Sequence, residues 1–143
     1  MLDEKTDSLR ALFEGVWRIE RQIDDQASGS LGSFHGHARL WRSLDGLAYH
    51  ETGELAFAGG SPMLAERKYV WQIQHQNVID VFFDDGRYFH SFNPTGSHWQ
   101  TEHICSPDRY EVSYDFASPT RWQSSWNVSG PRKRYRLTSV FTR

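Results

Sequence analysis

The sequence contains almost no cysteine, and its charges of opposite sign nearly balance. Cys105 is the single cysteine among 143 residues, which excludes an internal disulfide and a cysteine-rich metal site. A chain without disulfides fits a reducing compartment, so we expect a cytoplasmic protein. Sixteen Lys and Arg against eighteen Asp and Glu leave a formal net charge of −2. This balance disfavours a strongly basic binding surface, and we expect no nucleic-acid partner.

Long apolar runs are missing as well. No stretch approaches the roughly 20 apolar residues of a membrane helix, and the first residues lack the basic and apolar segments of a signal peptide. We therefore expect no membrane partner. The mean hydropathy is only −0.68, yet 15% of the residues are aromatic. Disordered chains lack aromatic residues, so this composition and length predict one folded domain, residues 1–143.

Turn residues recur at regular intervals after a short helical segment. We expect Thr6-Asp7-Ser8 to cap a helix within residues 1–14 that Gly15 ends. From Trp17 onward the hydrophobic pattern alternates with period two, as in strands. The expected strands are 15–25, 32–44, 47–58, 66–74, 78–84, 87–93, 97–105, 109–117, 121–129 and 132–142.

Short connections make consecutive strands antiparallel neighbours, and closing such a sheet removes its two free edges. The sequence therefore predicts an all-β, ten-stranded antiparallel up-and-down barrel over residues 15–143. Asp45-Gly46 and Asp85-Gly86 are typical two-residue hairpin turns, and Pro107-Asp108 and Gly130-Pro131 are further turns. The pairs expected from these turns are Tyr49–Arg42, Val81–His90, Phe83–Tyr88, Cys105–Tyr110 and Val128–Lys133.

Residues directly opposite each other share a face, so these pairs predict which side chains point into the barrel. One end collects inward apolar side chains and should be plugged: Trp17, Leu44, Leu47, Ile73, Phe92, Trp99, Phe116, Trp122 and Phe141. The other end collects inward polar side chains: Arg21, Arg67, Tyr69, Tyr88, His90, His103, Tyr110, Lys133 and Tyr135, with Glu51 near mid-height. Burying an unpaired charge costs several kcal/mol, so the polar end predicts a water-accessible cavity.

This cavity is the candidate site for a small, anionic, partly aromatic or aliphatic ligand. We expect Arg67 and Lys133 to bind a carboxylate or phosphate, and the tyrosines to supply hydroxyl contacts. The candidate ligand-binding residues are Glu51, Arg67, Tyr69, His90, His103, Tyr110, Trp126, Lys133 and Tyr135. The alternative is a purely structural network that closes the top of the barrel.

A known superfamily shares several of these motifs. Phe13-Glu14-Gly15-Val16-Trp17, a short helix leading into a Gly-x-Trp strand, resembles the calycin superfamily of lipocalin-like barrels. In that superfamily an arginine of the last strand packs over the tryptophan, which implies Arg143 over Trp17. A barrel of ten strands resembles the fatty-acid-binding and nitrobindin-like branches more than the eight-stranded lipocalins.

Three further motifs narrow the resemblance. Phe82-Phe83-Asp84-Asp85-Gly86-Arg87-Tyr88-Phe89-His90, His103-x-Cys105-x-x-Asp108-x-Tyr110 and Trp126-x-Val128-x-Gly130-Pro131-Arg132-Lys133 resemble a bacterial calycin-like family of unknown function. The resemblance implies the barrel fold and no particular activity.

Other functions compete with ligand binding. Glu51, Tyr69, Arg67 and the lumen histidines contain the groups for acid–base chemistry of a lyase or isomerase type, although no residue stands out as catalytic. His35, His37 and His50 point outward and indicate at most an adventitious metal site. No histidine follows His103, where the nitrobindin-like resemblance would place a haem ligand, so we expect no cofactor. Phe82, Phe89 and Trp41 are expected to face outward, where a continuous patch would favour a homodimer.

Overall fold

Ten antiparallel strands follow one short helix in the computed structural model, which describes residues 4–73 and 77–143. Residues 1–3 of the expected helical segment and residue 74 of the fourth expected strand lie outside this range. The elements are α1 (Glu4–Phe13), β1 (Gly15–Asp25), β2 (Ser30–Ser43), β3 (Gly46–Phe57), β4 (Met63–Ile73), β5 (Ile79–Phe83), β6 (Tyr88–Phe92), β7 (His98–Cys105), β8 (Asp108–Ser118), β9 (Arg121–Ser129) and β10 (Arg134–Thr142). The predicted fold class is confirmed.

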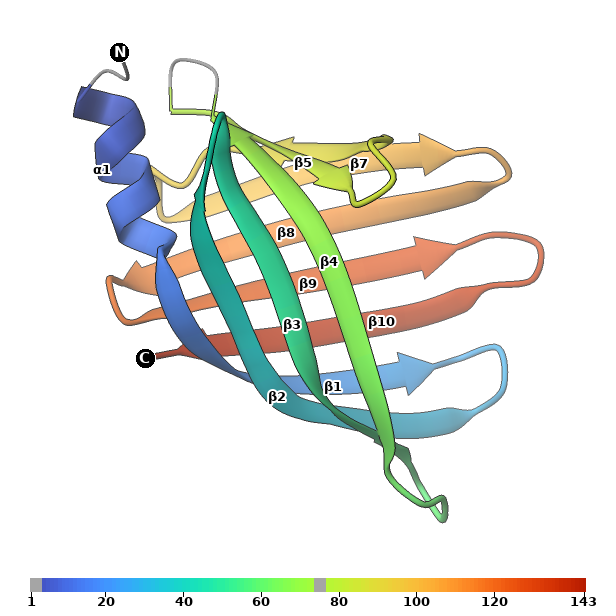
Figure 1. Cartoon of the computed structure of the whole chain (residues 1–143). Coiled ribbons are helices and arrows are strands. Elements are labelled where there is room, and N and C mark those ends of the chain that lie inside the picture. Colours follow the sequence, from blue (N-terminus) through green and yellow to red (C-terminus); the bar gives the residue numbers. More distant parts are fainter. Residues whose placement is uncertain (1–3, 74–76) are drawn as a thin grey trace.

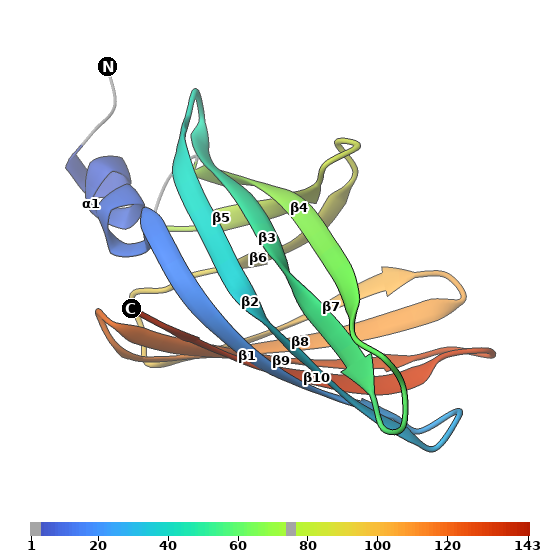
Figure 2. The same cartoon turned by 60° about the horizontal axis from the view of Figure 1, so that its bottom comes forward.

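The strands form one strongly curved sheet whose two end strands are β6 and β7. The order is β6-β5-β4-β3-β2-β1-β10-β9-β8-β7, so the first and last strands pair with each other. In Figure 1, β2–β4 cross in front of β8–β10, and Figure 2 shows the same two layers after a turn of 60°. Trp99 Nε1 donates a hydrogen bond of 3.1 Å to the Ser91 carbonyl across the β6–β7 seam. The barrel is therefore nearly closed, with side chains instead of a strand ladder joining these two edges.

Most of the predicted inward side chains form the core. Trp17, Ile19, Leu40, Ile79 and Phe92 are almost completely buried. Two members of the expected apolar plug are exposed instead. Trp99 is 36% exposed because it lies at the unpaired seam, and Leu44 is 89% exposed because it lies in the turn between β2 and β3.

Three of the four hairpins pair two residues away from the expected register. The observed pairs are Tyr49–Leu40, Cys105–Asp108 and Val128–Tyr135, where we expected Arg42, Tyr110 and Lys133 as partners. Side chains alternate along a strand, so a shift of two residues leaves every side chain on its face. The shift moves side chains along the barrel instead, and it leaves Lys133 outside β10.

The hairpin between β2 and β3 shows why its register differs. Ser43 pairs with Gly46, so Leu44 and Asp45 form the turn and Gly46 belongs to the strand. Gly46 has no positive φ, and a Cβ at this position would lie 2.0 Å from the Trp71 carbonyl oxygen. The glycine is needed for close approach to β4, and the predicted two-residue turn at Asp45-Gly46 was wrong.

The fourth hairpin contains a β-bulge. Val81 lies opposite His90 as expected, but the next residue, Phe82, lies opposite Tyr88. Phe89 is therefore the extra residue on β6, and a bulge can turn two consecutive side chains to the same face. Phe89 and His90 are both buried, whereas Tyr88 is 49% exposed. The expected outward position of Phe89 and inward position of Tyr88 were both wrong.

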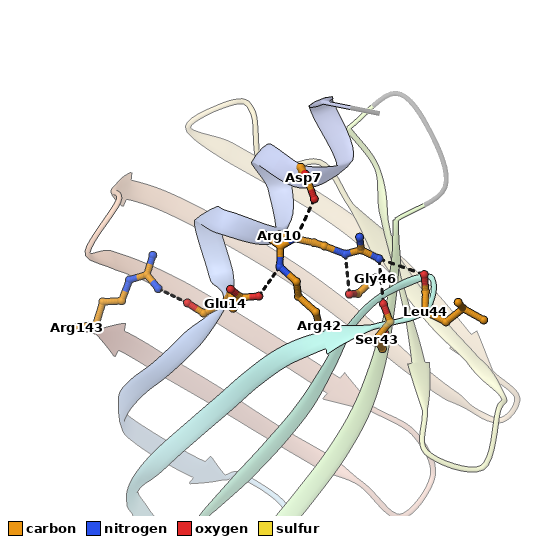
Figure 3. Close-up of polar contacts among 8 residues, drawn as sticks. All are labelled: Asp7, Arg10, Glu14, Arg42, Ser43, Leu44, Gly46 and Arg143. Carbon is orange, nitrogen blue, oxygen red and sulfur yellow. Dashed lines mark hydrogen bonds and ion pairs between the residues drawn. The ribbon is translucent and has the colours of Figure 1, made fainter. Parts of the chain in front are cut away.

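Helix α1 covers the apolar end of the barrel (Figure 1). It begins at Glu4, so Thr6-Asp7-Ser8 lies within the helix and does not cap it. Arg10 is 2% exposed and donates hydrogen bonds to the carbonyls of Ser43, Leu44 and Gly46 (Figure 3). α1 is the one helix among the described residues, and it is too short and too polar to cross a membrane.

The C-terminus joins this end of the molecule. The Arg143 guanidinium carbon lies 4.1 Å from the centre of the Trp17 ring, as the calycin resemblance implies. Arg143 also donates hydrogen bonds to the carbonyls of Leu12 and Glu14, at 2.7 and 2.6 Å. It therefore ties the helix end, the first strand and the last strand together.

Candidate functional site

A buried ion pair lies inside the barrel between β1 and β3. Arg21 donates two hydrogen bonds to the Glu51 carboxylate, at 2.6 and 3.0 Å, and a third to Ser139 Oγ at 2.6 Å. The Tyr49 hydroxyl donates to Glu51 Oε1 at 2.6 Å. Arg21 and Glu51 are 8% and 2% exposed. The bidentate geometry and the additional partners compensate the desolvation of both charges.

The charge states of this network follow from its contacts. Burial alone would raise the pKa of Glu51, but hydrogen bonds from Arg21 and Tyr49 outweigh it and lower that pKa. Burial likewise opposes the charge of Arg21, and Glu51 raises the pKa of that guanidinium overall. Burial and the neighbouring Glu51 carboxylate raise the pKa of Tyr49. The network therefore holds one positive charge, one negative charge and a neutral phenol.

Arg67 on β4 is a second inward cation, and it has a different environment. Glu51 lies opposite Arg67 in the β3–β4 ladder, but the Glu51 oxygens are already bonded to Arg21 and Tyr49. Among the described residues, no carboxylate lies within 4.0 Å of the Arg67 nitrogens. The guanidinium carbon lies 5.7 Å from the centre of the Trp126 ring. Arg67 is thus an exposed cation beside a neutral aromatic ring.

Two neighbouring cavities meet at these residues. The inner chamber has a volume of about 30 Å³ and the mouth cavity about 260 Å³. Arg21, Glu51, Arg67 and Leu137 line both cavities. The remaining wall of the mouth cavity is mostly apolar: Ile23, Phe34, Leu55, Phe57 and Ala65, with Asp25, Glu66 and Tyr135. Arg67 therefore lies where the two cavities adjoin.

His90 and Tyr114 form a buried polar pair at the inner chamber. His90 Nε2 and the Tyr114 hydroxyl lie 2.7 Å apart, and the two rings stack across the barrel. Burial, with a smaller effect of His103, lowers the pKa of His90 to about 3. Burial also raises the pKa of Tyr114 above its usual range. Both side chains are therefore neutral near pH 7.

The structure brings together some of the predicted ligand-binding residues and separates others. Glu51, Arg67, Tyr69, His90 and Trp126 line the inner chamber, and Tyr135 lines the mouth. His103, Tyr110 and Lys133 line neither cavity.

The structure shows why His103, Tyr110 and Lys133 line neither cavity. Phe89, turned inward by the bulge, lies between the chamber and the rings of His103 and Tyr110, at 5.5 and 5.6 Å. The Lys133 ammonium is exposed and pairs with Asp108 at 3.3 Å, so its expected position in the lumen was wrong. The register shift at this hairpin moved Lys133 beyond the strand.

Several residues of the site were outside the predicted set. Arg21 had the expected inward position at the polar end, but its pairing with Glu51 needed the β1–β2–β3 register. Tyr49, Tyr114, Ser124 and Ser139 also face the chamber. Their alternation with outward neighbours was the available signal, and nothing local distinguished them from ordinary core residues.

The outward candidates form no site in the described residues. His35 contacts Glu20, and His50 bonds to Glu66 at 2.8 Å. No cluster of three potential metal ligands occurs in the described part of the chain. Phe82 packs against Tyr88 on the outer face, but Phe89 is buried, so the expected patch with Trp41 is interrupted. The homodimer stays a prediction.

A family model described as a family of unknown function, DUF6314, matches residues 13–143. The solved structure of the S-type phycobiliprotein lyase CPES from Guillardia theta has a TM-score of 0.64 and 9% sequence identity, covering 96% of this chain and 91% of that one. A redesigned β-barrel, mFAP1, bound to DFHBI, has a TM-score of 0.44 and 14% identity, covering 94% of this chain and 98% of that one. No curated protein matches in sequence. The similarity to the lyase shows a shared calycin-like barrel fold.

Proposed function

The chain belongs to the DUF6314 family, whose function is unknown, and from this premise we propose that its barrel binds a small organic anion through Arg67. The observation that carries the proposal is the charge balance of the site. Arg21 already compensates Glu51, whereas Arg67 has no carboxylate partner among the described residues. An arginine guanidinium binds carboxylates and phosphates with two parallel hydrogen bonds.

The other carboxylates of the mouth cavity do not replace such a ligand. Asp25 accepts hydrogen bonds from the backbone N–H groups of Ala27 and Ser28, at 3.1 and 3.3 Å. Glu66 bonds to His50 at 2.8 Å. Arg67 therefore remains the cation that is available to an anion entering the mouth.

The apolar wall supports a ligand with an apolar body. Phe34, Leu55 and Leu137 line the mouth beside Arg67, and Trp126 presents its ring to the guanidinium. Ligand sites commonly combine an apolar wall with a few polar groups that orient the ligand. An aromatic or aliphatic carboxylate combines these two features in one small molecule.

The electrostatics favour binding over acid–base catalysis. A general acid or base works best when its pKa lies near the working pH. The pKa of Glu51 is lowered instead, and its oxygens accept three hydrogen bonds from Arg21 and Tyr49. We therefore assign Glu51 a structural role in positioning Arg21.

The test compares phenylacetate with phenylacetamide, which has a similar shape and no charge. Both are titrated into the protein, and Kd is measured by calorimetry and by NMR shifts of mouth residues. Phenylacetate should bind more tightly, and Arg67→Gln should weaken its binding about 10–100-fold, because a charged hydrogen bond contributes roughly 1.5–3 kcal/mol. The amide should be affected little.

Lys68→Gln provides a matched control. Lys68 is the next residue on the same strand, is exposed, and its loss changes the net charge by the same amount. It should leave phenylacetate binding close to wild type. Equal Kd values for acid and amide, or equal effects of the two substitutions, would contradict the assignment of Arg67.

A further inference from the structure

The wall of the mouth cavity contains two opposite charges that are not paired with each other. Arg67 and Asp25 both line this cavity. Among the described residues, no carboxylate lies within 4.0 Å of the Arg67 nitrogens, and no Lys, Arg or His nitrogen lies within 4.0 Å of the Asp25 oxygens. One cation and one carboxylate therefore face the same space without neutralising each other.

The other charged side chains of this wall have partners. Arg21 and Glu51 form the buried bidentate pair, and Glu66 bonds to His50 at 2.8 Å. A ligand in the mouth therefore meets one uncompensated positive charge and one uncompensated negative charge. A simple anion is complementary to Arg67 alone and leaves the Asp25 carboxylate without a counter-charge.

Asp25 also has a local role, which does not use its charge. It is the last residue of β1, and its Oδ1 accepts hydrogen bonds from the N–H groups of Ala27 and Ser28, at 3.1 and 3.3 Å. Asn supports the same kind of turn as Asp, so the turn needs the oxygen and not the negative charge. Asp25 is half-buried, and its Oδ2 has no hydrogen-bond partner among the described residues.

The sheet register separates the two charges. Arg67 lies opposite Glu51, Glu51 lies opposite Ala38, and Ala38 lies opposite Trp17 on β1. Asp25 is eight residues beyond Trp17 on that strand, at the β1–β2 turn. Each residue advances a strand by about 3.3 Å, so Asp25 lies at the rim of the mouth and Arg67 lies deeper in the barrel.

The mouth cavity has room for the body of a small ligand. Its volume is about 260 Å³. A cavity of about 150 Å³ is sufficient for benzene. The rest of the wall is mostly apolar and includes Phe34, Leu55 and Leu137. One ring or a short methylene chain therefore fits in the mouth itself, without entering the inner chamber.

We infer that the ligand is dipolar: its carboxylate binds Arg67, and an ammonium group at its other end binds Asp25 at the rim. This inference rests on the proposed function and extends it to a ligand class, the carboxylates that carry a terminal amino group on an apolar body. α-Amino acids are outside this class because their two charges are adjacent. The competing explanation is that Asp25 only shapes the turn, which predicts no preference for an ammonium group.

The experiment measures the ratio of Kd values within matched pairs of probes that differ only in the terminal ammonium group. The pairs are butanoate and 4-aminobutanoate, hexanoate and 6-aminohexanoate, and octanoate and 8-aminooctanoate, which together cover three charge separations. In the wild type at pH 7, the ammonium group should strengthen binding about 3–10-fold in at least one pair, because it gives Asp25 a charged hydrogen-bond partner. 2-Aminooctanoate, an isomer with adjacent charges, should bind no more tightly than octanoate.

Matched variants test which carboxylate recognises the ammonium group. Asp25→Asn keeps the oxygen that the turn needs and should bring the ratio to about one. Asp24→Asn should leave the ratio unchanged; Asp24 is the preceding residue of β1, is exposed, and its substitution changes the net charge by the same amount. Glu66→Gln should change the ratio much less than Asp25→Asn. Equal effects of these substitutions would overturn the assignment of Asp25.

The role of Arg67 is tested separately. Arg67→Gln should weaken both members of a pair by a similar factor and leave their ratio unchanged. A wild-type ratio near one at all three lengths, with binding still dependent on Arg67, overturns the dipolar ligand and keeps the proposed function. Absence of binding by every probe, phenylacetate included, overturns both.

A second measurement uses the wild type alone. The amide groups of Ala27 and Ser28 donate to the Asp25 carboxylate, so their NMR resonances report on its surroundings. These resonances should shift on adding the amino probe of the preferred length and shift much less on adding its partner without the ammonium group. Equal shifts with both probes would contradict the placement of the ammonium group at Asp25.

Discussion

Glu51 and His90 are both buried inside the barrel, but they keep different charge states. Glu51 is ionised because Arg21 and Tyr49 supply hydrogen bonds that outweigh the effect of burial. His90 faces no carboxylate in the described ion pairs, and burial keeps it neutral. The neighbours of each residue therefore decide whether it is charged or neutral when buried.

Protonation of His90 should destabilise the fold at acidic pH. Its pKa falls from 6.5 to about 3 on folding, so the unfolded state binds the proton first. Stability from this residue is complete above about pH 6.5 and declines as the pH falls toward 3, by up to about 1.4 kcal/mol per pH unit. Urea unfolding from pH 6.5 to 4.5, above the range of most carboxyl groups, should show a flatter dependence in His90→Phe than in wild type. A wild-type slope in His90→Phe would mean that folding does not shift the His90 pKa. The control variant His98→Phe should keep the wild-type slope.

At the level of elements, helix α1 and the β6 bulge close opposite parts of the interior. The helix places Phe13 against Trp71 and Trp122 at the apolar end, with ring centres 5.3 and 5.7 Å apart. The bulge places Phe89 against Trp126 at 5.1 Å, on the side of the chamber. The helix and the bulge both reduce the volume of the lumen, which explains why the inner cavity is small in a ten-stranded barrel.

The attachment of α1 should depend on Arg10 far more than on Arg42. Arg10 is buried and binds three carbonyls of the β2–β3 turn, whereas Arg42 pairs with Asp7 and Glu14 at the surface (Figure 3). Arg10→Met leaves those carbonyls without their donor and should lower the free energy of unfolding by about 2–4 kcal/mol. Arg42→Gln should stay near wild type, because exposed ion pairs contribute little. Chemical unfolding of the two variants measures the difference, and equal losses would show that the buried contacts do not anchor the helix.

At the scale of the whole molecule, the barrel is continuous except at one seam. β1 has a hydrogen-bonded neighbour on each side, β2 and β10, whereas β6 and β7 have one each. Side-chain contacts bridge the seam: Trp99 bonds to Ser91, and the His103 ring contacts Phe89. Such contacts hold the edges together without pairing their backbone groups.

Hydrogen exchange should identify this seam. About half of the amides of an edge strand point away from its neighbour and lack ladder bonds. Residues 88–92 and 98–105 should therefore exchange much faster than residues 15–25 of β1 when deuterium uptake is followed by mass spectrometry. Protection of β7 equal to that of β1 would contradict the open seam and indicate a closed strand ladder in solution.

The sequence by itself determined the fold class and the facing of most side chains. Period-two alternation and short turns specify antiparallel neighbours, and a register error of two residues leaves the faces unchanged, so Trp17, Arg67 and Trp126 could be assigned correctly. The motif around Gly15 and Trp17 also led to Arg143, through a resemblance to calycins.

Only the tertiary structure decided where each side chain lies along the barrel axis and which charged residues pair with each other. Lys133 left the lumen through a shift of two residues, and Phe89 entered it through a bulge; both depend on packing between strands and not on local pattern. From the sequence, either of two inward arginines, Arg21 and Arg67, could pair with Glu51. The strand arrangement pairs Glu51 with Arg21. Arg67 is left as the available cation for that reason, because pairing of charges is set by distances between residues that are remote in the chain.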